Sequence, residues 1–108
     1  MIEIERSHTL VTVTAASSAG TTTPRFPFDR FAGGGVFISS TGGATQINWH
    51  GASTADSTPM QIYSGGEAVT TAVTVGCHPV PDACFAFPYV APVLVGGTSA
   101  VLTVSLKG

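Results

Sequence analysis

Alternation of apolar and polar residues with a period of two is the feature that most restricts how this chain can fold. The stretch "IEIE" near the start alternates isoleucine with glutamate, and "SAVLTVSLKG" near the end alternates in the same way. Turn residues recur about every 8 to 12 residues and helical periodicity is almost absent, which is typical of a sandwich or small barrel. We therefore predict an all-β protein, a single antiparallel β-sandwich of about eight or nine strands, with jelly-roll connections as one arrangement.

The chain has the length of one domain. Its 108 residues are enough to bury one hydrophobic core, and neither an internal repeat nor a linker divides them. We expect one domain over residues 1–108. The small, polar stretch "ASSAGTTTP" predicts a loop, so residues 1–24 should form a partly extended N-terminal arm, or a strand followed by this loop.

Charge is scarce in this sequence. Only 9% of the residues are charged, against about 25% in an average domain. The net charge of −2 and four scattered basic residues form no stripe that could collect phosphates, so we predict no nucleic-acid partner. Because charge normally protects a soluble surface from association, we also expect further copies or other proteins to cover part of this one.

Nothing in the sequence predicts export or a membrane span. The first ten residues lack the basic start and the long apolar run of a signal peptide. The longest apolar region, residues 84–95, is interrupted by Pro88 and Pro92 and is shorter than the roughly 20 residues of a membrane-spanning helix. Without a signal peptide, oxidised cysteines are not assumed.

Two segments predict particular β structures. "VFISSTGGATQINWH" predicts a hairpin with strands over 36–39 and 45–50 and a turn at Gly42 and Gly43. "FAFPYVAPVLV" predicts a strand that its prolines confine to a sheet edge or a bulge. The run from Gly33 to Gly35 indicates a turn or bulge, since no Lys-Ser or Lys-Thr follows it as in a phosphate-binding loop.

The stretch "GCHPVPDAC" contains the two cysteines of the chain, Cys77 and Cys84. Their spacing is not that of a common structural zinc site, and a redox C-x-x-C is absent. Two interpretations remain open, a short disulfide between Cys77 and Cys84 or a pair of buried free thiols. The sequence "PDA" between them is suited to a single helical turn that begins near proline.

Catalytic chemistry has little support. The six acidic residues lie beside turns or at exposed strand positions, no G-x-S-x-G motif is present, and the three histidines are dispersed. We predict no enzyme activity, no metal and no cofactor. The aromatic residues fit a core, but an alternative is a sugar-stacking face beside the polar row of the expected return strand. That face comprises Gln46, Asn48, Trp49, His50 and Tyr63.

A charge-poor chain rich in Gly, Thr and Ala that ends in "AVLTVSLKG" resembles the small β-sandwich structural proteins of virus particles, in particular phage capsid, capsid-decoration or tail components. The resemblance lies in the style of the whole chain, so it assigns no residue a role. It implies a non-enzymatic building block of the virion, made in the host cytoplasm. Such a block packs in many copies against itself and against other structural proteins of the particle.

Flat β faces and uncovered strand edges suit this kind of assembly. The candidate contacts are in the N-terminal segment and the glycine run: Ile2, Ile4, Leu10, Val11, Gly33, Gly34 and Gly35. The alternative function is a glycan-binding or adhesin-like module that uses the sugar-stacking face.

Overall fold

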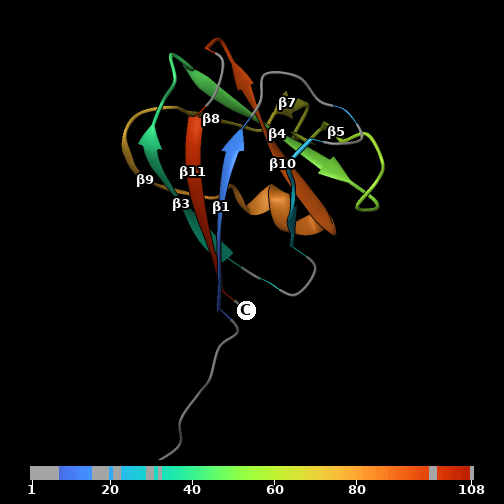
Figure 1. Cartoon of the computed structure of the whole chain (residues 1–108). Helices are drawn as coiled ribbons and strands as arrows, with labels where there is room; N and C mark the ends of the chain where they lie inside the picture. The colour runs from blue at the N-terminus through green and yellow to red at the C-terminus, as the bar shows by residue number, and fades with distance from the viewer. Residues whose placement is uncertain are drawn as a thin grey trace, which may run out of the picture.

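The computed structural model describes residues 8–15, 20, 23–28, 31, 33–97 and 100–107, with only the backbone for 8–15 and 107. Within these residues the chain forms eleven β-strands and one short 3-10 helix. Two antiparallel sheets lie face to face (Figure 1), which confirms the prediction of an all-β sandwich. Strand β1 (His8–Ala15) falls inside the expected N-terminal region, whereas residues 1–7 are outside the described part.

Sheet A contains β1, β11 (Ala100–Lys107), β3 (Gly33–Ser40) and β9 (Gly76–Pro79), in that order. Strand β11 pairs along its whole length with β1, and from Val101 to Lys107 with β3. Its alternate residues Leu102, Val104 and Leu106 are fully buried, as the period-two pattern predicts. Sheet A is therefore organised around the C-terminal strand.

Sheet B contains β2 (Phe26–Pro27), β10 (Tyr89–Val95), β4 (Gln46–Ala52) and β5 (Met60–Gln61), and β8 (Thr70–Ala72) also pairs with β4. Strands β6 (Tyr63–Ser64) and β7 (Glu67–Ala68) form a separate small hairpin. Its turn, Gly65 and Gly66, has positive φ at both positions, which only glycine adopts freely. The region from β5 to β8 thus breaks into four short strands, which explains why more strands form than the eight or nine expected.

The predicted hairpin over residues 36–50 is wrong. Strand β3 belongs to sheet A and β4 to sheet B, so the turn at Gly42 and Gly43 carries the chain from one sheet to the other. Gly96 and Gly97 return it from β10 to β11, and a Cβ on Gly97 would lie 2.5 Å from the backbone nitrogen of Ala44. The two crossings pack so closely that a side chain at Gly97 has no room.

The expectation that the proline-containing strand lies at an edge is also wrong, because β10 lies between β2 and β4. Pro92 pairs with Trp49. The backbone N–H of Trp49 donates to Val69 and its carbonyl accepts from Ile62, both on the side away from β10. The Pro92–Trp49 pair is therefore a non-hydrogen-bonded pair, and the missing N–H of proline leaves no gap in the ladder.

A single core fills the space between the sheets. Its largest fully buried side chains are aromatic and aliphatic: Trp49, Phe26, Phe28, Ile38, Ile47, Leu102 and Leu106. The 3-10 helix η1 (Asp82–Ala86) follows Pro81, as the "PDA" sequence predicts, and contributes Cys84 to the core. In β3, β4 and β11 buried side chains alternate with half-buried or exposed ones, and the more exposed side chains are available for function.

Candidate interaction surfaces

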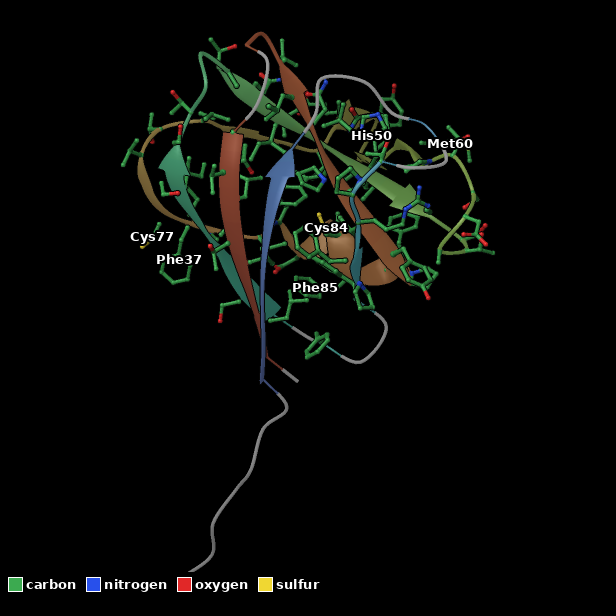
Figure 2. The ribbon with its side chains drawn as sticks, viewed as in Figure 1. Phe37, His50, Met60, Cys77, Cys84 and Phe85 are labelled. Atoms are coloured by element: carbon green, nitrogen blue, oxygen red, sulfur yellow. The ribbon has the colours of Figure 1, made fainter. Side chains whose placement is uncertain are left out.

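The outer face of sheet A carries an exposed aromatic residue. Phe37 is 45% exposed, and its backbone neighbours are Thr103 on β11 and Cys77 on β9. Figure 2 shows Phe37 and Cys77 side by side, away from the core. Phe37 is not among the residues predicted from the sequence to form a contact, although its position between the inward-facing Val36 and Ile38 indicates an outward orientation.

The described side chains on this face are uncharged. They come from β3, β9 and β11 and comprise Phe37, Ser40, Cys77, Pro79, Val101, Thr103 and Ser105. Val75, 69% exposed, precedes β9 along the chain. An apolar residue surrounded by small uncharged ones can be buried against a partner without leaving a charged group buried and unpaired.

The backbone edge of β9 is less suitable for association. The N–H of Val80 donates to Gly34, and hydrogen-bonded pairs alternate along an antiparallel ladder, so His78 and Gly76 also point toward β3. Only Cys77 and Pro79 direct their backbone outward, and proline has no N–H. The edge is short and offers a single strand N–H to a partner, which is a common protection against edge pairing.

The two cysteines are not joined. Cys77 is an exposed free thiol, whereas Cys84 is a buried free thiol in the core. The disulfide interpretation fails because β9 directs Cys77 to the outer face and η1 directs Cys84 inward. The alternative of two buried thiols is correct for Cys84 only. Burial raises the pKa of the Cys84 thiol to about 12.

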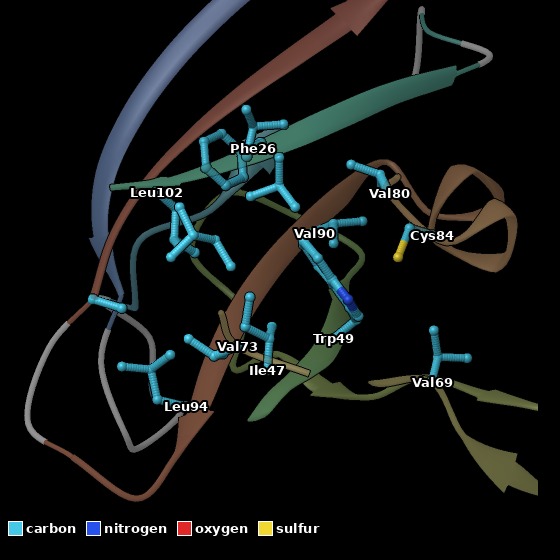
Figure 3. Close-up of a cluster of buried hydrophobic side chains, with 14 of the residues drawn as sticks. Phe26, Ile47, Trp49, Val69, Val73, Val80, Cys84, Val90, Leu94 and Leu102 are labelled. Atoms are coloured by element: carbon cyan, nitrogen blue, oxygen red, sulfur yellow. The ribbon is translucent and has the colours of Figure 1, made fainter. Parts of the chain in front are cut away.

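Trp49 does not belong to a sugar-stacking face. Its side chain is fully buried, among residues such as Val69, Cys84 and Val90 (Figure 3). The indole Nε1 donates a 2.9 Å hydrogen bond to the Thr71 hydroxyl, which gives the buried ring its polar partner. The proposed glycan face therefore loses its central aromatic residue.

The other residues of the predicted glycan face lie in two different places. Gln46, Asn48 and His50 are half-buried on one side of β4; Gln46 Nε2 donates to Asn48 Oδ1 at 2.8 Å, and His50 Nδ1 lies 3.1 Å from the Asn48 carbonyl. Tyr63 is 66% exposed on β6, beside a pocket. The polar row is confirmed as a row, but no exposed aromatic platform accompanies it.

We call this pocket the end pocket; it lies where β4 ends and β10 begins. Its volume is about 350 Å³, within the lower range of ligand pockets. Gly51, Ile62 and Phe87 contribute apolar lining, and the exposed Met60 and Tyr63 also line it. A Cβ on Gly51 would lie 2.9 Å from the Phe87 ring, so glycine is what allows this ring to pack on β4.

The loop after β4 forms another wall of the end pocket through Ser53, Ser57 and Thr58. Arg25 holds this loop, since its guanidinium donates to the carbonyls of Thr54 and Ser57. The Ser57 backbone N–H donates to the Thr54 hydroxyl at 3.0 Å, which closes the turn internally. None of the residues that line the pocket is charged.

The predicted assembly contacts lie in two places. Leu10 and Val11 are in β1, which among the described strands pairs only with β11 at the edge of sheet A, and Ile2 and Ile4 are outside the described residues. The three glycines from Gly33 are within β3, where a Cβ on Gly34 would approach the Ser105 carbonyl to 2.5 Å. Close packing inside sheet A thus accounts for Gly34, and contact of these residues with another chain stays a prediction.

Two further observations concern the part of the chain that the structure describes. It holds no group of three His, Cys, Asp or Glu side chains that could bind a metal ion. It also has no helix with the length and hydropathy needed to cross a membrane.

The β-sandwich defined above is shared with solved structures. The SPBc2 prophage-derived protein YomS matches 100% of this chain, over 99% of its own length, with a TM-score of 0.66 and 15% identity. The PBSX exported protein XepA matches 99% of this chain over 40% of its own length, with a TM-score of 0.59 and 14% identity. No protein-family model and no curated protein sequence matches the chain. The resemblance to proteins of phage origin is thus supported, at the level of the fold.

Proposed function

We propose that this chain is a non-enzymatic structural protein of a phage particle, a capsid, decoration or tail component, which acts by packing in many copies through its β surfaces. The observation that carries this proposal is that Phe37 is exposed on the outer face of sheet A and that the described side chains around it are uncharged. Burial of this aromatic side chain against a partner is favourable, and no charge in the described part around it has to be desolvated.

The positions of the charged side chains support the same interpretation. In the described part of the chain the charged side chains Arg25, Asp56, Glu67 and Asp82 all lie outside the outer face of sheet A. A face that meets copies of itself or of a related chain avoids like-charge repulsion when it carries no charge. The shared fold of the prophage-derived protein favours a phage setting for this assembly.

The native mass of the protein tests this proposal. We expect light scattering to give a mass that is a multiple of the chain mass, rising with concentration and unchanged by a reductant, because contacts between β surfaces need no disulfide. A protein that stays at 10.9 kDa at every concentration would overturn the proposal. Loss of the larger species on reduction alone would instead assign assembly to Cys77.

A further inference from the structure

We propose that copies of this chain associate head to tail, with Phe37 of one copy seated in the end pocket of the next. This inference rests on the proposed function and names the two surfaces that meet. Phe37 is a large apolar side chain on the outer face of sheet A, whereas the end pocket is an apolar hollow lined by residues of β4, β5, β6 and the segment before β10.

The two surfaces match in chemistry. An entering phenylalanine would meet the rings of Tyr63 and Phe87 and the thioether of Met60, all favourable contacts for an aromatic ring. Neither the pocket lining nor the described side chains around Phe37 include a charge, so the contact buries no unpaired ion. The hydroxyl groups of the loop wall form a polar border around an apolar centre, as in protein interfaces generally.

The pocket is also largely preformed. Gly51 leaves room for Phe87, and Arg25 fixes the loop that carries Ser57. A preformed pocket loses little conformational entropy when a partner binds, which favours binding by a single anchoring side chain.

The positions of the two surfaces determine the type of contact. Phe37 and Met60 lie on opposite sides of the molecule in Figure 2, so one copy cannot fill its own pocket. A contact that joins two different surfaces of the same chain is heterologous, and it generates a closed ring or an open filament. Each copy then uses both surfaces except at a filament end.

Two variants separate these surfaces. Phe37→Thr removes the aromatic side chain but keeps a residue that favours strands. Met60→Glu with Tyr63→Glu introduces charge at two exposed residues that line the end pocket. Val95→Glu is the matched control, since Val95 is 40% exposed at the end of β10 remote from the pocket. We expect each of the first two variants to weaken self-association by at least about tenfold, and the control to retain it.

Mixing the two variants tests the head-to-tail geometry. The Phe37→Thr chain keeps an intact pocket and the doubly substituted chain keeps Phe37, so an equimolar mixture should give a dimer with one copy of each and nothing larger. The dimer also shows that both variants fold. Light scattering reads its mass, and mass spectrometry of the intact complex reads its composition.

The other outcomes are distinct. If the wild-type protein assembles but both variants assemble equally well, the Phe37–pocket contact is overturned while the proposed function stands. If each variant is monomeric and the mixture stays monomeric, head-to-tail pairing is overturned in favour of a contact between like surfaces. A wild-type protein that is itself monomeric overturns both proposals.

Discussion

Cys77 on β9 lies directly opposite Phe37 on β3, in a non-hydrogen-bonded pair of sheet A. Residues in such a pair have Cα atoms about 4.5 Å apart, so the thiol and the ring share the same small area of the outer face. Cys84, by contrast, has no exposed surface. One thiol therefore belongs to the candidate interface and the other to the core.

This difference predicts selective modification of the thiols. We expect a maleimide to attach once to the native protein, at Cys77, because Cys84 is buried and its pKa of about 12 keeps it protonated. Intact mass spectrometry measures the number of adducts. The Cys77→Ser variant should gain none until it is unfolded, and rapid double labelling of the folded protein would contradict the structure.

Self-association should protect the same thiol. If Phe37 is buried by a neighbouring copy, Cys77 beside it becomes less accessible, so its alkylation should slow as protein concentration rises. The Phe37→Thr variant provides the control, since its alkylation rate should not depend on concentration. A rate in the wild-type protein that is equally independent of concentration would place the interface elsewhere.

The stability of the fold should fall at high pH because of Cys84. Burial raises the pKa of this thiol from 9.0 to about 12, so between these values the folded state keeps a proton that the unfolded state has lost. The folded state then binds more protons, and the free energy of unfolding decreases as pH rises, by up to about 1.4 kcal/mol per pH unit. Below pH 9 the thiol is protonated in both the folded and the unfolded state, so its ionisation does not lower the free energy of unfolding.

Urea unfolding of the wild type and of Cys84→Ala, at about pH 8 and about pH 10.5, measures this effect. Other groups that titrate in this range are common to both proteins, so the difference between them isolates Cys84. We expect the wild type to lose more stability than the variant. Equal losses would show that Cys84 can ionise in the folded protein.

The sequence predicts which residues face inward better than which strands pair. Alternation along β11 placed Leu102 and Leu106 in the core correctly, because burial on one face is a local property of a strand. Strand β4 pairs with β10, distant in sequence, and with β5 and β8, whereas the two-glycine turn after β3 favoured a pairing of β4 with β3. Turn chemistry alone cannot distinguish a hairpin from a crossing between sheets.

The candidate surfaces, like the strand pairing, depend on contacts between segments that are distant in sequence. Phe37 can be assigned to an outer face from the alternation in β3, although its exposure depends on the absence of a covering segment. The end pocket combines Gly51, Ser57, Tyr63 and Phe87 from separate segments, so no local pattern predicts it. Trp49 was compatible with either a core or a surface role in the sequence, and the structure buries it completely.

The hydrogen bond from Trp49 to Thr71 should stabilise the fold measurably. Thr71→Val keeps the shape of the side chain but leaves the indole N–H without its acceptor, which should cost about 1–3 kcal/mol. Trp49 is the single tryptophan, so its fluorescence reports unfolding in urea. Thr70→Val, on an exposed neighbouring position of β8, should change stability by less than about 0.5 kcal/mol. Equal effects of the two substitutions would exclude a special role for this bond.

Gly34 and Gly33 should respond differently to the same substitution. A Cβ at Gly34 would lie 2.5 Å from the Ser105 carbonyl and 2.9 Å from Leu106 Cδ2, whereas a Cβ at Gly33 has nothing within 4 Å. Gly34→Ala must therefore separate β3 from β11 and should cost about 1–3 kcal/mol. Gly33→Ala should be neutral or stabilise by up to about 1 kcal/mol, because alanine restricts the unfolded chain. Unfolding in urea measures both, and a Gly34→Ala variant as stable as wild type would show that sheet A is packed less tightly here than the structure indicates.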